Sequence, residues 1–362
     1  MVSDRLIALV RCPDCGSTLA RDGGPDVTLT CQGCGRTYRA PDGAYLDLRP
    51  AAQFAEQTKY LDEALHADAR HERVSPPLLG SKIRNDMLRE FLQPAAGDLI
   101  VDLGCGSGRA LLWNRELGAE TVGVDISPYF SDEARHEMPL LLADLRRLPF
   151  ADGTFGKAWS LDVLEHLSPE ALRAMLTEAN RVLAPGGSLF VYTHVRKNAR
   201  IAVGLRWING LARVLERAGL IDMRQERLRK SDHLNPLADV PDLERVTREC
   251  GFRIERIRFY TPIVGGFVEN ILMRMAERRL TKRAARRLAP SAGGADVDAL
   301  AIREVRSAAK DQISRSRATY AILRALSFAM KLDLLLFGRI TSGPFFALLV
   351  KERAANREPR TA

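Results

Sequence analysis

The feature that most constrains the fold is a short apolar run at residues 98–102, which passes directly into the sequence Asp-Leu-Gly-Cys-Gly-Ser-Gly at residues 102–108. Glycine has no Cβ, so the three glycines of this turn let the backbone bend sharply and approach a ligand closely. Residues 109–117 have a helical pattern, and a helix that begins there directs unpaired N–H groups toward the turn. By itself the turn predicts a strand–helix junction that binds a nucleotide-like ligand.

Strand and helix patterns alternate after this turn. Predicted strands lie at residues 121–125, 140–143, 155–161 and 188–193. Ser168 and Pro169 have the residue types of a helix N-cap and a first helical position, so a helix is expected from there to about residue 183. Such alternation implies an α/β fold in which helices cover both faces of a mostly parallel sheet.

Two details separate the ligand classes that use such a turn. The dinucleotide-binding fingerprint needs a third glycine at position 109, but that residue is Arg and the third glycine lies at 108. Two later predicted strands also end at carboxylates. Asp125 can accept hydrogen bonds from both hydroxyls of a ribose, each worth roughly 1.5–3 kcal/mol, and Asp144 can accept from an exocyclic amine such as that of adenine. The alternative for each is a loop residue that caps a helix.

Five motifs occur in order: Val-Asp-Leu-Gly-Cys-Gly-Ser-Gly (101–108), Gly-Val-Asp-Ile-Ser (123–127), Ala-Asp-Leu-Arg-Arg-Leu-Pro-Phe (143–150), Asp-Val-Leu-Glu-His-Leu (162–167) and Leu-Ala-Pro-Gly-Gly-Ser-Leu (183–189). With them, residues 97–194 resemble the class I S-adenosylmethionine (SAM)-dependent methyltransferases, in particular the branch related to ubiquinone/menaquinone methyltransferases. The resemblance implies a Rossmann-like seven-stranded sheet of order 3-2-1-4-5-7-6, with only the last strand antiparallel. It also implies SAM contacts at Asp102, Gly104, Cys105, Gly106, Asp125, Ile126, Asp144, Leu145 and Leu161.

The resemblance implies methyl transfer to an O, N or C nucleophile from a sulfonium that is already reactive. Holding the nucleophile, methyl and sulfur in line can supply about 7–11 kcal/mol. A general base is needed only where the nucleophile must lose a proton, and the candidates are His166, His194 and His233. His194 ends a predicted strand at the edge where ligands bind in open α/β sheets. The alternative for each is a surface or hydrogen-bonded histidine.

Two reaction classes do not fit the chain. Methyltransferases of exocyclic amines carry an Asn/Asp-Pro-Pro-Tyr motif, which would fall near residues 160–163, where this chain has Ser-Leu-Asp-Val. Methylation of cytosine C5 needs a nucleophilic cysteine, but Cys105 lies inside the glycine-rich turn and Cys250 ends a predicted helix.

Four cysteines near the N-terminus have the spacing C-x2-C-x15-C-x2-C, which is typical of a zinc ribbon: Cys12, Cys15, Cys31 and Cys34. Gly16 and Gly35 follow the second cysteine of each pair, and we expect them to turn backbone N–H groups toward the thiolates. Zinc would supply folding free energy that 50 residues cannot obtain from a core, and four protein ligands leave no open position, so its role would be structural or in recognition. Iron or free thiols are the alternatives. The segment resembles the Trm112-like zinc ribbon found beside several methyltransferases.

The chain is predicted to divide into five parts: a zinc-ribbon module at 1–50, a helical linker or cap at 51–95, the SAM-binding core at 96–262, a helical insertion at 263–342, and the last strand and tail at 343–362. The insertion departs from the resembled fold, whose sixth and seventh strands form a tight hairpin. A basic helix is expected at 267–288, and 320–337 is mainly apolar. These helices can lie in a membrane interface or pack on the sheet as a lid.

The net charge of +9 attracts nucleic acid, anionic lipid or an acidic small molecule. No signal peptide is recognisable and no uncharged stretch approaches 18 residues, so we expect a cytoplasmic protein, peripheral at the inner face of the membrane if the insertion binds lipid. The leading interpretation is a methyltransferase for a small, apolar or lipid-linked acceptor.

Two alternative functions remain. The first is an rRNA or tRNA base methyltransferase, because residues 43–48 resemble the end of the zinc ribbon in a family of large-subunit rRNA guanine methyltransferases. Against it, the ribbon offers only Arg36 and Arg39 near its second cysteine pair, and only Tyr38 as a stacking platform. The second alternative is a non-catalytic SAM-binding scaffold protein.

Overall fold

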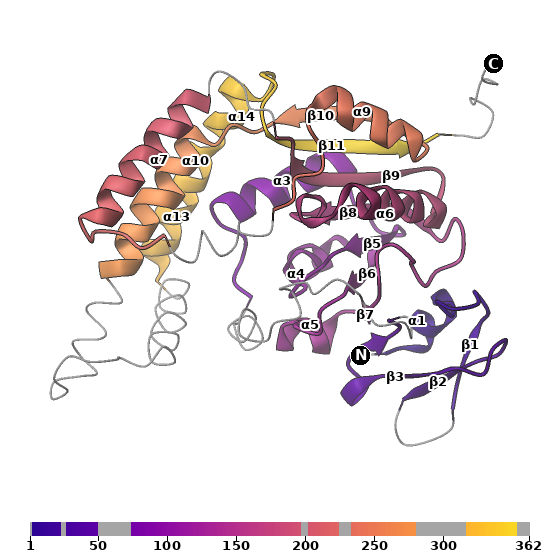
Figure 1. The fold of residues 1–362 in the computed structure, drawn as a ribbon. Coiled ribbons are helices and arrows are strands. Elements are labelled where there is room, and N and C mark those ends of the chain that lie inside the picture. Colours follow the sequence, from indigo (N-terminus) through magenta and orange to yellow (C-terminus); the bar gives the residue numbers. More distant parts are fainter. Residues whose placement is uncertain are drawn as a thin grey trace, which may run out of the picture.

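The structure, a computed structural model, describes residues 2–22, 27–49, 74–196, 202–223, 233–279 and 316–352. Its centre is a mixed sheet of order β10-β11-β9-β8-β5-β6-β7-β4 (Figure 1). These strands are β4 (Leu46–Asp47), β5 (Leu99–Leu103), β6 (Glu120–Asp125), β7 (Leu140–Leu142), β8 (Phe155–Leu161), β9 (Leu183–His194), β10 (Phe252–Phe259) and β11 (Pro344–Lys351). Only β11 runs antiparallel to its neighbours, β9 and β10. The fold is the α/β, Rossmann-like fold that the sequence predicted.

The main sheet has one strand more than the seven predicted. β4 lies parallel to β7, with Leu46 opposite Leu141, and the Leu48 N–H donates to the carbonyl of Leu142 at 2.8 Å. Leu46 and Leu48 are fully buried. The prediction of seven strands was wrong because a two-residue ladder is too short to produce a recognisable alternation in the sequence.

Helices cover both faces of the main sheet. One face packs against α1 (Asp4–Leu9), α6 (Pro169–Val182) and α9 (Val240–Glu249), and the other against α3 (Gly80–Leu92), α4 (Arg109–Asn114), which continues into the 3-10 turn η3 (Arg115–Leu117), and α5 (Asp132–Glu137). Successive side chains of a strand point to opposite faces of the sheet. In β5, Val101 therefore packs in the core that contains α6, and Ile100 in the core that contains α3.

The sequence predicted the start of α6 correctly but placed the start of the following strand, β9, too late. Its predicted start is confirmed, because the Ser168 hydroxyl accepts a hydrogen bond from the Ala171 N–H at 3.2 Å and Pro169 is the first helical residue. The strand predicted after it at 188–193 begins earlier, since Leu183 already pairs with Phe155 ahead of a register shift in the ladder.

The N-terminal module forms a second, antiparallel sheet of order β1-β2-β3. Its strands are β1 (Leu19–Arg21), β2 (Thr28–Cys31) and β3 (Thr37–Arg39), followed by the 3-10 turn η1 (Pro41–Gly43). The module is joined to the larger sheet, because Val10 pairs with Phe150 and the Arg11 N–H donates to the carbonyl of Pro149 at 2.8 Å. Its apolar residues share one core with α6 and the main sheet.

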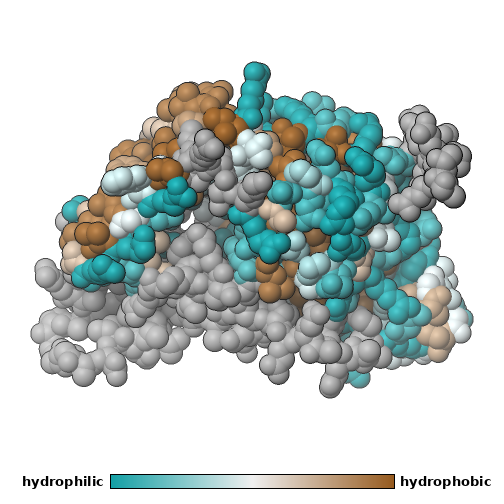
Figure 2. Space-filling model, turned by 45° about the horizontal axis from the view of Figure 1, so that its top comes forward, coloured by the Kyte–Doolittle hydropathy of each residue, from teal (hydrophilic) through white to brown (hydrophobic). Residues whose placement is uncertain are grey.

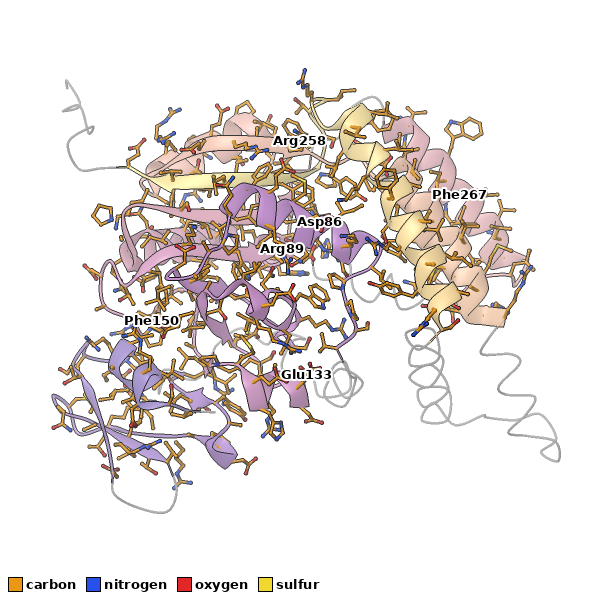
Figure 3. All side chains as sticks on the ribbon, turned by 180° about the vertical axis from the view of Figure 1, so that it is seen from behind. Asp86, Arg89, Glu133, Phe150, Arg258 and Phe267 are labelled. Atoms are coloured by element: carbon orange, nitrogen blue, oxygen red, sulfur yellow. The ribbon has the colours of Figure 1, made fainter. Side chains whose placement is uncertain are left out.

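A bundle of helices lies at one end of the main sheet (Figure 1). It consists of α7 (Ala202–Arg217), α10 (Ile263–Phe267), the π-helical η5 (Val268–Met273), α13 (Arg317–Met330) and α14 (Leu332–Phe337). The buried carboxylate of Asp333 in α14 accepts hydrogen bonds from the first N–H groups of α10, those of Val264 and Gly265, at 2.9 and 2.8 Å. Asp86 on α3 (Figure 3) binds Lys331 of the bundle at 2.5 Å, so α3 and the bundle are held together.

The basic helix expected at 267–288 begins earlier, at Ile263, and changes to π-helical geometry at Val268. The predicted end of this helix at 288 lies outside the described residues. So do residues 51–73 of the linker or cap predicted at 51–95, whose described part contains α3. In the described ranges, no helix combines the length and apolar character needed to cross a membrane.

Candidate functional site

The glycine-rich turn lies between β5 and α4. Gly104, Gly106 and Gly108 have φ angles of 84°, 53° and 83°, in the left-handed region that favours glycine. A Cβ added at Gly104 would lie 2.4 Å from Cγ2 of Val163, so packing requires this glycine. A Cβ added at Gly106 would meet nothing within 4 Å. The turn is therefore closed by Val163 at one glycine and open to a ligand at the other, while the side chain of Cys105 between them is buried.

Asp125 ends β6 and holds the turn in place. Its Oδ2 accepts a hydrogen bond from the Gly106 N–H at 2.7 Å, and its Oδ1 accepts from the N–H and the hydroxyl of Ser127, both at 2.9 Å. A carboxylate has about four lone-pair positions, so about one remains for a ribose hydroxyl unless a protein bond is exchanged. Sequence reasoning missed Ser127, although it lies within the motif at 123–127.

Asp102, one of the predicted SAM contacts, is a buried carboxylate. It lies in β5, is 2% exposed, and its Oδ2 has no hydrogen-bond partner among the described residues. Burial raises the pKa of Asp102 to about 8, the neighbouring Trp159 indole opposes this rise, and the charge of Asp125 adds to it. A buried acceptor without a donor is costly, so this oxygen fits a ligand that brings a positively charged donor.

The other predicted cofactor residues reach the same edge of the sheet. Asp144 follows β7, and its carboxylate pairs with the Arg146 guanidinium at 3.0 Å while its Oδ1 accepts the Arg146 N–H at 2.9 Å. An adenine amine would therefore share Asp144 with Arg146. Ile126 follows β6, Leu145 follows β7 and Leu161 ends β8, and all three side chains are half-buried.

The three candidate histidines come together beyond the ends of β8 and β9. His166 belongs to the 3-10 turn η4 (Leu164–His166), and His194 ends β9. The ring centroid of His233 lies 4.6 Å from that of His166 and 5.2 Å from that of His194. Three positions chosen separately from the sequence thus form one cluster, at the edge where ligands bind in such sheets.

Glu165, which sequence reasoning missed, lies beneath this cluster and is 2% exposed. Its Oε2 accepts a hydrogen bond from the Thr193 hydroxyl at 2.9 Å, and its Oε1 lies 4.0 Å from Nδ1 of His194. Burial, helped by the charge of Asp162, raises the pKa of Glu165 to about 8. One sequence signal was present, because Glu165 is a carboxylate between Leu164 and a candidate histidine.

Asp162, beside the histidine cluster, has a strained backbone conformation. Its φ is 57°, a left-handed value that is uncommon for any residue other than glycine. Its carboxylate lies 3.4 Å from Nε of Arg84, whose guanidinium also lies over the ring of Tyr192, 5.5 Å from the centroid. Strained positions of this kind concentrate at binding and catalytic sites. The wall next to the histidines is thus built from α3, β8 and β9 together.

The four cysteines of the N-terminal module form one cluster whose sulfur atoms lie within 4.8 Å of one another. Sγ of Cys31 accepts from the N–H groups of Gly33 at 3.4 Å and Cys34 at 3.5 Å. The backbone N–H groups that follow Gly16 and Gly35, those of Ser17 and Arg36, are directed at the thiols of Cys15 and Cys34, as expected. The N–H groups of the two glycines themselves donate to the carbonyl oxygens of Cys12 and Cys31. Four converging sulfurs with N–H donors fit a tetrahedral zinc ion.

Comparison with known proteins identifies the centre of the chain. Residues 101–191 match the family model described as a methyltransferase domain. A probable tRNA methyltransferase 9B from Mus musculus is 36% identical over 144 residues, which are 38% of this chain and 32% of that protein. A chloroplastic tocopherol O-methyltransferase from Arabidopsis thaliana is 32% identical over 142 residues, which are 36% of this chain and 40% of that protein.

Among solved structures, a phosphoethanolamine N-methyltransferase 2 from Haemonchus contortus in complex with SAM aligns at 16% identity with a TM-score of 0.46, covering 82% of this chain and 59% of that one. The chain spans less than half the length of the two curated relatives above. The similarity to them is therefore a similarity of the central domain.

Proposed function

Because residues 101–191 form a class I, SAM-dependent methyltransferase domain, we propose that the protein transfers a methyl group from SAM to an O, N or C nucleophile of a small, apolar or lipid-linked acceptor. The observation that carries the proposal is the buried Oδ2 of Asp102, which has no hydrogen-bond partner in the described part of the chain and precedes the turn that opens at Gly106. The ammonium group of the methionine part of SAM would supply the missing donor.

The chain's own residues would then position the reactants. Asp125 would hold the ribose, and Asp144 the adenine amine, with the half-buried Ile126, Leu145 and Leu161 as apolar contacts. When bound, SAM supplies an electrophilic methyl group, so the protein needs mainly to align the acceptor with it. Where the acceptor must lose a proton, His194 is the strongest candidate to take it, with His166 and His233 beside it.

The apolar surface of the helical bundle supports an apolar or membrane-associated acceptor. In the described part of the chain, all the exposed large hydrophobic side chains except Leu234 belong to this bundle or its connecting turns. The most exposed are Trp207 at 77%, Leu335 at 74% and Phe328 at 73%. Figure 2 shows hydrophobic side chains gathered over the bundle, and Phe267 lies there too (Figure 3). Concentrated exposure of this kind marks an interaction surface.

The arrangement on α7 fits a membrane interface. Val203, Trp207, Leu211 and Val214 follow one another at helical spacing, so they form a single exposed stripe. Exposed Arg206 and Arg213 lie beside the stripe. Apolar side chains flanked by arginines favour the surface of a membrane with anionic lipids, so we propose peripheral binding through the bundle.

An RNA acceptor is the second candidate, because one of the relatives is a probable tRNA methyltransferase. The ribbon gives it little support. Tyr38, the aromatic that would stack a base, is 3% exposed and is covered by Arg36, whose guanidinium lies 5.0 Å from the ring centroid. A non-catalytic SAM-binding scaffold would share the cofactor site and differ only in turnover.

We further propose that Cys12, Cys15, Cys31 and Cys34 hold a structural zinc ion, in a module like the Trm112-like ribbons. Its effect would reach the catalytic domain, because the Arg147 guanidinium donates to the carbonyl of Asp14 at 2.8 Å. The loop that follows β7 and carries Asp144 is thereby fixed to the first cysteine pair.

Calorimetric titration with SAM tests the cofactor site. Gly106→Ala places a methyl group in the open space of the turn, and we expect it to weaken SAM binding at least tenfold. Gly156→Ala is the matched control, because its Cβ also meets open space but its backbone does not have a positive φ. Equal SAM affinity in the two variants, or no SAM binding by the unaltered protein, would remove the cofactor assignment.

Liposome flotation separates the acceptor classes. We expect the protein to float with anionic vesicles, and the triple variant Trp207→Ser, Phe328→Ser and Leu335→Ser to remain at the bottom while SAM binding persists. Binding of tRNA that weakens steeply between low and physiological salt, with no flotation, would favour the RNA alternative instead.

A further inference from the structure

The cluster beyond β8 and β9 has a composition that methyl transfer alone does not explain. One ligand atom each from Glu165, His166 and His233 lies within 4.8 Å of the others. Two imidazoles and a carboxylate are a set that binds divalent transition metals in proteins. The residues come from two separate segments, η4 and the loop at 233–239 that precedes α9. Their convergence is therefore a property of the fold and not of local sequence.

The surroundings of Glu165 match those of a metal ligand. Its carboxylate is buried, and no Lys or Arg side chain within the described ranges forms an ion pair with it. A buried carboxylate is stable when it is paired or coordinates a metal. The Thr193 hydroxyl donates to Oε2 at 2.9 Å, which fixes the carboxylate in the way that supporting residues orient the ligands of metal sites. The backbone carbonyl of Glu165 also accepts the Asn235 N–H at 2.9 Å, which ties the His233 segment to η4.

The cluster adjoins the cofactor turn. Val163, which lies over Gly104, precedes Glu165 by only two residues. A group bound by the cluster would thus lie beside the turn, because β8 is a neighbour of β5 in the sheet and β9 lies next to β8.

We propose that Glu165, His166 and His233 bind one divalent transition-metal ion that holds a hydroxyl group of the acceptor. Three protein ligands leave positions open, so the ion fits an acceptor with two neighbouring oxygens, such as a catechol-like or vicinal diol group. The ion makes the hydroxyl more acidic, as it does for bound water. This role rests on the proposed methyl transfer, whereas the binding of the ion does not.

The reaction balances without a further reactant. The hydroxyl proton leaves to His194, which lies at the edge of the cluster and passes it to water. The oxygen then forms a bond to the methyl carbon of SAM, and the bond between that carbon and sulfur breaks with its electron pair on sulfur. The products are the methyl ether, S-adenosylhomocysteine and one proton. The metal keeps its oxidation state throughout.

Titration with Mn²⁺, followed by the electron paramagnetic resonance signal of the free ion, tests the site in the full chain with zinc already bound. Mn²⁺ prefers nitrogen and oxygen ligands over thiolates, so the cysteine cluster should not compete for it. We expect one binding site, with affinity reduced at least tenfold in His233→Ala and in Glu165→Gln. His136→Ala is the control, because that exposed histidine on α5 hydrogen-bonds the carbonyl of Asp132 and lies outside the cluster.

Retained SAM affinity in His233→Ala shows that the variant is folded. The proposal is overturned if Mn²⁺ does not bind the unaltered protein, or if His233→Ala binds it as tightly. A different result would overturn the proposed methyl transfer but leave the metal site standing: the unaltered protein would then bind Mn²⁺ but not SAM. Co²⁺ gives an independent reading, since an ion at the histidines shows no thiolate-to-cobalt absorption whereas one at the cysteines does.

Discussion

Replacing Asp102 with Asn should change how the stability of the cofactor-free protein depends on pH. Asn has nearly the same shape as Asp but carries no titratable proton. In the folded protein, burial raises the pKa of Asp102 to about 8, whereas an Asp in an unfolded chain has a pKa of about 3.9. Between these values the folded state keeps a proton that the unfolded state has released.

The size and sign of the effect follow from this difference. Asp102 favours the folded state most below about pH 4, and that contribution is lost as the pH rises toward about 8, at about 1.4 kcal/mol per pH unit. Above about pH 8 it no longer changes. Between about pH 5 and pH 8, the unfolding free energy of Asp102→Asn should therefore rise relative to the unaltered protein by about 4 kcal/mol, as an upper limit. Glu165, whose pKa is also raised, is present in both proteins and cancels from the difference.

Urea unfolding followed by tryptophan fluorescence at several pH values, with zinc held constant, measures this difference. Titration with SAM adds a second readout. If the ammonium group of SAM pairs with the ionised carboxylate as proposed, the affinity of the unaltered protein should rise about tenfold per pH unit up to about pH 8. Asp102→Asn should bind SAM weakly at every pH. A stability difference that stays constant across the pH range would refute the assignment of a raised pKa to Asp102.

Three further predictions concern other parts of the fold. Gly104→Ala should abolish SAM binding because its Cβ would collide with Val163, and the double variant with Val163→Ala should recover part of the affinity in calorimetry. Asp333→Ala should lower the unfolding free energy by about 2–4 kcal/mol in urea titrations, since it leaves the part-buried Val264 N–H and the buried Gly265 N–H of α10 without acceptors. Cys31→Ser should lose zinc in elemental analysis and weaken SAM binding, whereas Cys250→Ser, a control outside the cysteine cluster, should keep its zinc.

The turn and the carboxylates of the proposed cofactor site could be placed in the fold from the sequence because their signals are local. The turn at 102–108 and the carboxylate of Asp125 lie at the ends of strands whose apolar runs are easy to recognise, and parallel strands bring their carboxyl ends to one edge. Even there, the sequence could not show that Asp125 already accepts three protein hydrogen bonds. Hydrogen-bond saturation depends on the final positions of Gly106 and Ser127.

The acceptor side was harder to predict because it depends on contacts between distant segments. His166 and His233 are separated by 67 positions in the sequence, and no pattern shows that their rings meet. The position of Glu165 beside His166 was only a weak signal, since burial beneath the histidines is what makes its carboxylate unusual. β4 was missed for a similar reason, because its two residues become a strand only through pairing with β7.

The two halves of the site are in contact through Val163. The side chain of Val163 fills the space that a Cβ at Gly104 would need, and the same short segment continues into Glu165 and His166. We therefore expect a displacement of the glycine turn to reach η4 and the Glu165 carboxylate, which accepts a hydrogen bond from the Thr193 hydroxyl of β9. Because the His233 segment is bonded to η4 through Asn235, it would follow the same displacement. We therefore expect the apolar contact of Val163 with Gly104 to couple cofactor binding to the geometry of the histidine cluster.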